Sequence, residues 1–203
     1  MSRPGMTAII DELRGLTEAG TAEYTLGTTI YWTDDALQDM LDMNRVDLIH
    51  EMLQATPIVV GGTVSSPIRY PYYKFLRYQT GYTFLENTSG GTDVFYLQDG
   101  TGATLGTALW SADYRRGVVN FVNDTLGTAI YFTGSAYDLN ATAADVWRGK
   151  ASHYAPSSFN FSTDNHSIQR EQVYTHCKEM AAYFESISGD AISTAQMDRG
   201  DAY

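Results

Sequence analysis

The apolar residues of this 203-residue chain change their spacing along the sequence, and these changes divide it into helical and extended regions. Near the start, apolar residues recur at the spacing of one helix face: Ile9, Ile10, Leu13 and Leu16. This spacing, ended by Gly20, predicts a short helix over residues 5–19. The next stretch, TLGTTIYWT, is rich in β-branched and aromatic residues and predicts a short extended segment over residues 25–33.

A longer helix is predicted over residues 34–55. Thr33 has the side chain of an N-cap, and Asp34 and Asp35 lie in the first turn, where the helix dipole favours negative charge. The main apolar stripe of this helix consists of Leu37, Met40, Leu41, Leu48 and Met52. A second apolar side consists of Met43, Val46 and Leu53. Two apolar sides indicate burial in the fold on one side and against a neighbouring molecule on the other.

The chain changes character after residues 57–67, which are rich in Pro, Gly and Ser and predict a linker. From residue 68 to residue 132, Tyr and Phe are frequent, and turn residues separate short apolar runs such as DVFYL and VVNFV. This pattern predicts an antiparallel β unit of four to six strands joined by hairpin turns. The sequence TLGT occurs three times, starting at residues 25, 104 and 125. We interpret these copies as similar strands under similar constraints.

Two more helices are predicted in the last third of the chain. Asn140 has N-cap chemistry, and Pro156 ends a helix over residues 141–155. One face of this helix consists of Ala143, Trp147, Ala151 and Tyr154. Gly149 costs about 1 kcal/mol relative to Ala in a helix, which indicates close packing at that position. A final helix is predicted over residues 167–187, with a helix-packing seam of Val173, Cys177, Met180, Phe184 and Ile187.

These elements predict an α+β fold in which packed helices from both chain ends carry an inserted antiparallel β unit. Residues 1–56 and 137–188 form the helical part, residues 68–136 form the β unit, and residues 189–203 form a polar tail. The residues expected in helix packing and the core are Leu41, Leu48, Trp147, Tyr154, Cys177 and Phe184.

Charge and composition change this picture by excluding some classes of function. The chain has 13 basic and 24 acidic residues, a net charge of −11, and its basic residues are too few and too scattered for the basic stripe of a nucleic-acid-binding protein. The acidity either serves solubility or gives a surface that repels DNA. No stretch approaches the ~20 apolar residues of a membrane span, and the first residues lack the apolar core of a signal peptide. We therefore expect the protein in the cytoplasm of the producing cell at synthesis.

Sequence motifs that carry chemistry are missing. There is no Walker loop, GxGxxG, HExxH, GxSxG or CxxC motif. The histidines, His50, His153, His166 and His176, do not have metal-ligand spacing, and the single cysteine excludes an intrachain disulfide. We therefore expect no enzymatic activity, no cofactor and no metal.

Three segments resemble proteins of the head–tail connection of tailed phages. TIYWTDDALQDMLD (29–42) is similar to the strand-into-helix opening of connector proteins, and DYRRGVVNF (113–121) resembles a D-x-x-x-G-x-V-x-F hairpin of such virion proteins. The segment over residues 137–184 is similar to the C-terminal half of neck adaptors. There an Ala-rich helix with a Trp leads to an F-x-F-S-x-D segment and a closing helix.

This resemblance implies a structural virion protein at the head–tail interface. It implies a homo-oligomeric ring of twelve subunits that joins the portal protein to tail or stopper proteins and lines the DNA channel. DNA would pass through without sequence-specific binding. In the connectors that this chain resembles, a C-terminal arm reaches into the portal, so the resemblance assigns portal docking to Ile192, Met197, Arg199 and Tyr203.

Two other functions stay open. A tail-completion or stopper protein of the same neck would differ from an adaptor in its docking partner. A carbohydrate- or receptor-binding module would use the Tyr-rich segment RYPYYKFLRYQTGY (69–82), because Tyr is a good exposed contact residue. Alternating aromatic residues in a β unit more often form core and sheet face, and a glycan array would discriminate the two roles.

Overall fold

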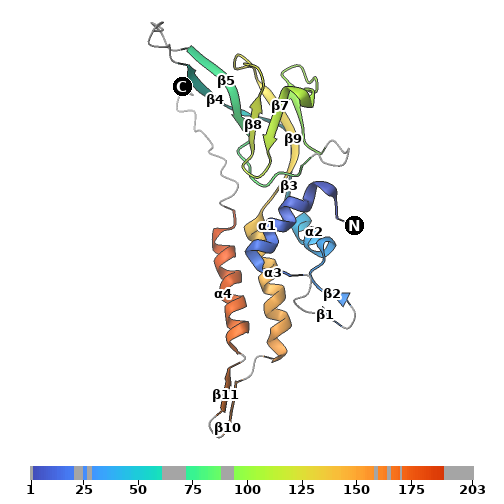
Figure 1. Cartoon of the computed structure of the whole chain (residues 1–203), viewed down its shortest axis with the longest axis vertical. Coiled ribbons are helices and arrows are strands. Elements are labelled where there is room, and N and C mark those ends of the chain that lie inside the picture. The colour runs from blue at the N-terminus through green and yellow to red at the C-terminus, as the bar shows by residue number, and fades with distance from the viewer. Residues whose placement is uncertain are drawn as a thin grey trace, which may run out of the picture.

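The computed structural model describes residues 2–20, 25–26, 29–60, 72–87, 94–157, 160–163, 166–169 and 171–189. Its helices are η1 (Pro4–Met6), α1 (Thr7–Thr17), α2 (Asp34–Met43), η2 (Thr107–Leu109), α3 (Leu139–Tyr154), η3 (Ala155–Ser157) and α4 (Glu171–Ile187). Its strands are β1 (Thr25–Leu26), β2 (Thr29–Ile30), β3 (Arg45–Met52), β4 (Gln54–Val60), β5 (Tyr72–Gln79), β6 (Tyr96–Asp99), β7 (Trp110–Asp113), β8 (Val118–Phe121), β9 (Ile130–Tyr137), β10 (Asn160–Thr163) and β11 (His166–Gln169). The predicted α+β class is confirmed, with a helical part at one end of the molecule and a β unit at the other (Figure 1).

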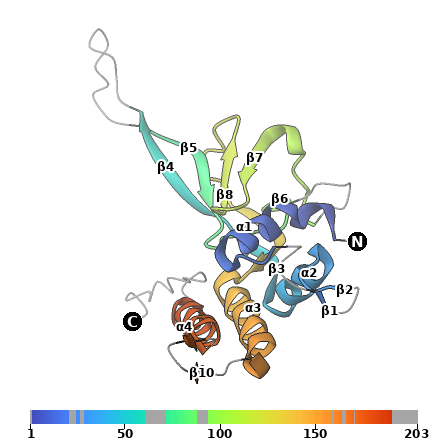
Figure 2. The ribbon, with the colours of Figure 1, turned by 60° about the horizontal axis from the view of Figure 1, so that its bottom comes forward.

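Helix α3 is the centre of the helical part. Figure 2 shows α2 and α4 on opposite sides of α3, with α1 between α3 and the β unit. Trp32 packs closely on α3 at Gly149, where an added Cβ would lie 3.1 Å from the Trp32 ring. The buried residues of this helical core include Met6, Leu13, Trp32, Leu37, Leu41, Ala143, Trp147, Cys177 and Phe184. Tight packing at Gly149 is thus confirmed.

The starts of α2 and α3 are both capped by side chains. Thr33 accepts a hydrogen bond from the Ala36 backbone N–H (3.1 Å), so the predicted N-cap is confirmed. Helix α3 begins two residues earlier than predicted, because Asp138 rather than Asn140 is the cap, accepting from the Ala141 N–H at 2.9 Å. An Asp side chain satisfies the unpaired N–H groups of a first turn as well as Asn does.

The prediction of a helix over residues 34–55 is wrong beyond Met43. Residues 45–52 form strand β3, which pairs antiparallel with β9, and Leu48 therefore contacts the β core and not the helical core. The apolar residues of this stretch fit both periods at first, since Val46 and Leu48 also alternate as in a strand. The register shifts between Leu48 and Glu51, and His50 has φ of 58°, so the alternation breaks at a bulge.

The β unit consists of two antiparallel sheets that share one core. The strand order is β3-β9-β6 in one sheet and β4-β5-β8-β7 in the other. Strand β3 continues through Leu53 into β4, so one stretch of chain contributes to both sheets. The core between them includes Leu48, Leu53, Tyr78, Leu85, Phe95, Leu97, Trp110, Val119, Ile130 and Phe132. The β unit therefore begins at residue 45 and not at residue 68.

Pro57 explains why the start of the β unit was predicted as a linker. Proline in a stretch that resembles a helix indicates its end, but Pro57 lies inside β4, at a register shift between Thr56 and Ile58. Strand β4 is an edge strand, where a residue without an N–H group is tolerated. The rest of the predicted linker, residues 61–67, lies outside the described residues.

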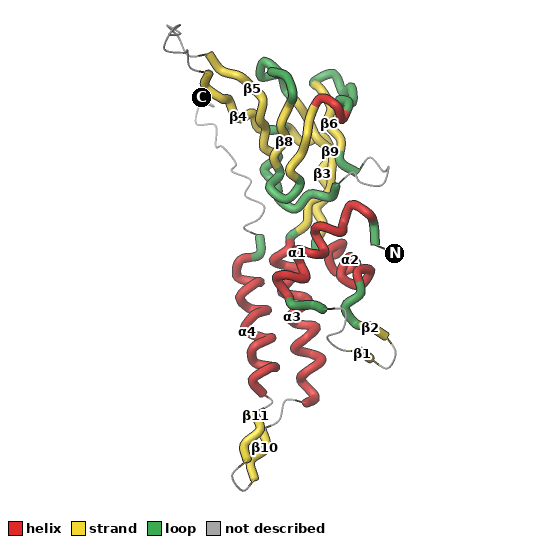
Figure 3. Tube along the Cα trace, viewed as in Figure 1, coloured by secondary structure: helices red, strands yellow, loops and turns green. Residues whose placement is uncertain are grey.

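The final helix begins at Glu171, four residues later than predicted. The residues before it form a short β10–β11 hairpin in which Asn160 pairs with Gln169. Figure 3 shows this hairpin beyond the ends of α3 and α4, which lie side by side as a two-helix arm. Of the predicted seam, Cys177 and Phe184 are buried with Ala181, but Val173 is exposed.

Gly117 fixes the β7–β8 hairpin, which is the segment 113–121 singled out in the sequence. It has φ of 64°, and a Cβ at this position would overlap the carbonyl oxygen of Tyr82. The three TLGT segments, in contrast, do not form similar strands. Residues 25–26 lie in β1, Thr104 makes an isolated bridge to Gln98, and residues 125–128 form the turn that precedes β9.

Candidate functional site

No metal-binding group of three His, Cys, Asp or Glu residues occurs in the part of the chain that the structure describes. His50 stacks on Tyr131 with ring centroids 4.2 Å apart, and His176 meets the edge of Trp147 at 5.6 Å. Within those same described ranges, no helix is long and apolar enough to cross a bilayer. The features that remain as candidates are a buried polar network, the exposed flanks of the arm and one apolar pocket.

The buried polar network joins the helical part to the β unit. Arg3 Nη1 and Nη2 donate to the carboxylate of Asp42 at the end of α2 (2.9 and 2.6 Å). Arg3 Nε donates to Glu86 Oε1 at 2.9 Å, and the Tyr137 hydroxyl donates to Glu86 Oε2 at 2.5 Å. Glu86 is 3% exposed, so its charge depends on these partners. We call these four residues the junction network.

The two donors of the junction network, Arg3 and Tyr137, keep their protons at neutral pH. Burial, together with the hydrogen bond to Glu86, raises the pKa of the Tyr137 phenol, so it remains a donor. The hydrogen bonds to Asp42 raise the pKa of the Arg3 guanidinium further above its already high value. A group that acts as a catalytic acid or base needs a pKa near the working pH. This network is therefore suited to holding two parts of the molecule together.

Other arginine side chains also lie against carboxylates. Further pairs on the described residues are Arg14–Asp34, Arg45–Asp47, Arg115–Glu12, Arg116–Asp113, Arg148–Asp145 and Arg148–Glu185. The Arg115–Glu12 pair, at 2.6 Å, is a second contact between the β unit and the helical part, here at α1. Since these cations are locally neutralised, they do not form a stripe that could hold DNA phosphates.

The two long flanks of the helical part are exposed. Helix α4 packs on α3 through one buried stripe and leaves Val173 and Tyr183 exposed on its other faces. Helix α2 lies on the opposite side of α3, and Met43 at its end is exposed. Both flanks thus present apolar side chains to solvent.

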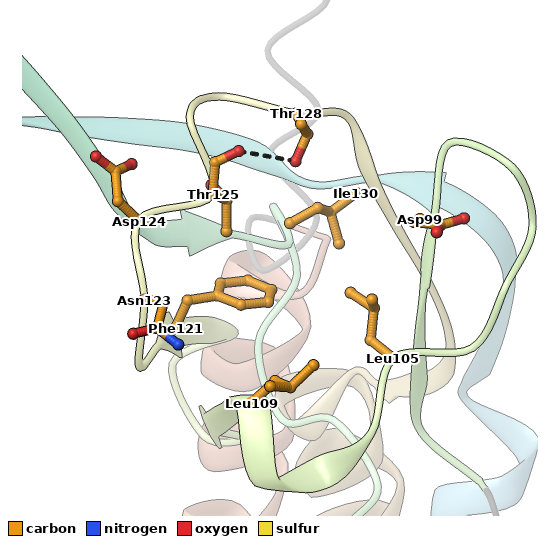
Figure 4. Close-up of a pocket in the computed structure, with 9 residues that line it drawn as sticks. All are labelled: Asp99, Leu105, Leu109, Phe121, Asn123, Asp124, Thr125, Thr128 and Ile130. Carbon is orange, nitrogen blue, oxygen red and sulfur yellow. Dashed lines mark hydrogen bonds between the residues drawn. The ribbon is translucent and has the colours of Figure 1, made fainter.

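An open apolar pocket of about 190 Å³ lies in the β unit. Figure 4 shows the side chains of Leu105, Leu109, Phe121 and Ile130 pointing to its centre, with Asp99 and Asp124 at opposite margins. Its other lining residues are Asn123, Thr125 and Thr128. Engineered cavities of about 150 Å³ bind benzene, so this space holds one apolar group.

Both carboxylates at the margins of the pocket are ionised at neutral pH. Hydrogen bonds from the Thr101 hydroxyl and backbone lower the pKa of Asp99. Hydrogen bonds from the backbone N–H groups of Phe75 and Leu126 lower the pKa of Asp124. An apolar centre therefore lies between two fixed negative charges.

The Tyr-rich segment considered for carbohydrate binding is mainly a core element. Tyr78 is 1% exposed, and its hydroxyl group bonds the Thr125 side chain at 2.5 Å. Phe75 and Tyr82 pack against the β core, whereas Tyr73 is exposed. Residues 69–71 lie outside the described residues. The described part does not form an exposed row of aromatic rings.

The residues selected from the sequence divide into three groups. Leu41, Trp147, Cys177 and Phe184 are buried in the helical core, and Tyr154 packs against it half-buried. Leu48 is buried in the β core. The proposed docking residues Ile192, Met197, Arg199 and Tyr203 lie outside the described residues.

Sequence reasoning missed both the junction network and the pocket. Arg3 and Tyr137 are 134 positions apart, and no local pattern links them. The pocket had one local signal. Leu126-Gly127 lies in a turn between two strand-like runs, where Asn-Gly is the usual pair. A leucine in place of the asparagine is therefore visible in the sequence alone.

Comparison of the chain with models of known protein families gives no match, and comparison with curated proteins gives no significant match. The resemblance of three segments to connector proteins and the exposed surfaces of the structure are the remaining indications of function.

Proposed function

We propose that this chain is a structural subunit of the neck of a tailed phage, where copies form a ring between the portal and the tail. The observation that carries the proposal is that α2 and α4 lie on opposite sides of α3 and that each has exposed apolar side chains within a polar surface, Met43 on α2 and Val173 and Tyr183 on α4. A closed ring requires a heterologous interface, in which two different faces of the same subunit meet. Opposite flanks of one subunit supply such a pair of faces.

The arm gives physical support to this arrangement. Elements of a domain normally pack in layers around a core, but α4 buries only the stripe around Cys177, Ala181 and Phe184. A neighbouring subunit that covers Val173 and Tyr183 would complete the packing of α4. Exposed apolar side chains of this kind are typical of interaction sites.

The charge distribution agrees with a channel through which DNA moves. The net charge is −11, and the arginines described above are paired with carboxylates. Protein–DNA affinity depends largely on contacts between cations and phosphates, so a surface whose arginines are paired with carboxylates retains DNA less strongly. In this proposal the virion interface binds portal and tail proteins, and DNA is not a specific ligand.

The test uses the full chain mixed with a candidate portal protein from the same genome, and particles are examined by electron microscopy and native mass spectrometry. Tyr183→Glu and Met43→Glu should each abolish rings on the portal and leave the melting temperature nearly unchanged, because both side chains are exposed. Tyr73→Glu, an exposed change on β5, is the matched control and should assemble normally. Normal rings with both flank variants would refute the proposal.

The docking role of the C-terminal tail is tested in the same assay. Deleting residues 190–203 should leave the melting temperature unchanged and abolish binding to the portal, since each tail binds weakly and a ring of tails binds by multivalency. If the full chain ignores the portal but binds the tail proteins, it is the stopper or tail-completion protein of the same neck.

A further inference from the structure

The turn between β8 and β9 holds an apolar side chain in a conformation that disfavours it. Thr128 N–H donates to the Thr125 carbonyl at 3.1 Å, and the two central residues, Leu126 and Gly127, have φ of 55° and 73°. Positive φ at both positions defines a type I′ turn, for which Asn-Gly is strongly preferred. Leu126 is nevertheless 81% exposed, so packing within the chain does not explain why a leucine is held there.

This turn is fixed in place by bonds to a neighbouring strand. Asp124 Oδ1 accepts from the backbone N–H groups of Phe75 and Leu126, both at 3.0 Å. The Thr125 hydroxyl donates to the Phe75 carbonyl at 2.9 Å. Leu126 is therefore presented rigidly, which lowers the entropy that a contact at this position would lose on binding.

The turn belongs to the margin of the apolar pocket. Asn123, Asp124, Thr125 and Thr128 line the pocket on both sides of Leu126 in the chain. Val122 is 69% exposed, and its backbone N–H donates to the carbonyl of the pocket residue Leu109 at 3.0 Å. Leu109 is itself half exposed, and Val122 and Leu126 are exposed next to lining residues in the chain; we call these three residues the apolar margin.

We propose that this pocket and its apolar margin are a docking site for a segment of a partner protein that carries one bulky apolar side chain flanked by basic residues. The size of the pocket selects a single apolar anchor, and Asp99 and Asp124 on opposite margins select positive flanks. No lysine or arginine lies among the residues that line the pocket. The charge of Lys74 acts on Asp124 from outside the lining, and the two carboxylates together still leave the margins net negative.

Charge also distinguishes this partner from the chain itself. A second copy has a net charge of −11, so it is a poor electrostatic match for a site between two carboxylates. Residues 190–203 contain three aspartates and one arginine, so the chain's own tail also has the wrong sign. The site is separate from the flanks of α2 and α4, and it does not depend on the proposed role in the neck.

The experiment titrates the full chain, with labelled Leu and Ile methyl groups, with three synthetic peptides. One peptide has a central Phe between pairs of Lys, the second replaces Lys by Glu, and the third replaces Phe by Ala. The Lys–Phe peptide should shift the methyl signals of Leu105, Leu109 and Ile130. The other two peptides should bind at least about tenfold more weakly, because each lacks one of the two recognition features.

Leu126→Asn is the decisive variant. It should raise the melting temperature, because Asn is tolerated at positive φ, and it should weaken binding of the Lys–Phe peptide several-fold. Asp99→Asn with Asp124→Asn should remove the preference for Lys over Glu flanks.

Several results would overturn the proposal. Methyl shifts that change with protein concentration in the absence of peptide would indicate self-association. Equal affinities for the Lys and Glu peptides would show that the two carboxylates do not select a basic partner. Saturation by an alkyl detergent without any binding of peptides would identify a lipid site instead. An absence of methyl shifts with every probe would also refute it.

Discussion

Removal of the Arg3 side chain tests whether the junction network holds the helices to the β unit. Arg3→Met would leave the Glu86 carboxylate 3% exposed, with the Tyr137 hydroxyl as its remaining side-chain partner. Removing one partner of a buried ion pair costs about 3–5 kcal/mol. Because the Arg3 side chain is 36% exposed, water replaces part of the contact, and we expect a smaller loss of about 2–3 kcal/mol in the free energy of unfolding.

A double-mutant cycle isolates the coupling within this network. Glu86→Gln keeps an acceptor for the phenol and leaves Arg3 bonded to Asp42, so it should cost only about 1 kcal/mol. The double variant contains no unpaired buried charge. Its loss in free energy of unfolding should therefore be smaller than the sum of the losses of the two single variants by about 1–2 kcal/mol. For a chain of this length, a loss of 2–3 kcal/mol lowers Tm by roughly 4–12 °C.

Urea unfolding, followed by tryptophan fluorescence and circular dichroism, measures these free energies of unfolding. Arg116→Met is the control, since its ion pair with Asp113 is long, at 4.0 Å, and exposed. Additive losses in the cycle, or equal losses for Arg3→Met and Arg116→Met, would refute the reasoning.

Three further predictions concern stability. Trp147→Ala should cost about 3–5 kcal/mol, whereas Trp147→Phe should cost about 1–2, because the indole N–H has no acceptor among the described residues; thermal unfolding of both variants checks this. Gly117→Ala should destabilise by about 2 kcal/mol or more, whereas Gly15→Ala in α1, with open space around it, should stabilise by up to about 1 kcal/mol in the same assay. The pKa values of Asp99 and Asp124 are lowered in the fold, so their contribution to the free energy of unfolding is complete above about pH 3.9 and is lost as the pH falls through the folded pKa values. The double variant Asp99→Asn with Asp124→Asn should therefore lose less stability on acidification, as measured by thermal unfolding at several pH values.

Local chemistry in the sequence was enough to predict several elements. Thr33 with Asp34 and Asp35 marks the start of α2, and the cap is present at 3.1 Å. Turn residues separate the strands of the β unit, and Gly117 lies where the β7–β8 hairpin needs positive φ. In each case the signal and the structure that it predicts lie within a few residues of each other, so long-range contacts do not override it.

Strand β3 could not be predicted in the same way. The stretch Arg45–Met52 has apolar residues that fit a helix continued from α2, and local spacing does not separate the two possibilities. What decides is strand β9, because Val46 and Leu48 pair with Ala136 and Gly134, nearly ninety positions away. A sheet stabilises a strand through cross-strand partners, so its intrinsic preference is weaker than that of a helix. For the same reason, the ion pair between Arg3 and Glu86 could not be predicted, because the two residues are distant in the sequence.

The three TLGT segments show how far this dependence extends. At residues 25–26 the motif contributes the first strand of a two-residue ladder, at residue 104 it makes a single bridge, and at residues 125–128 it forms a type I′ turn. The four letters permit each of these conformations, and the contacts around them select one. In the third copy the selection is made by Phe75 and Asp124, which hold the turn against β5. Because Asn would satisfy this turn better than Leu126 does, the contacts of the single chain do not account for the leucine, and the docking proposal rests on this mismatch.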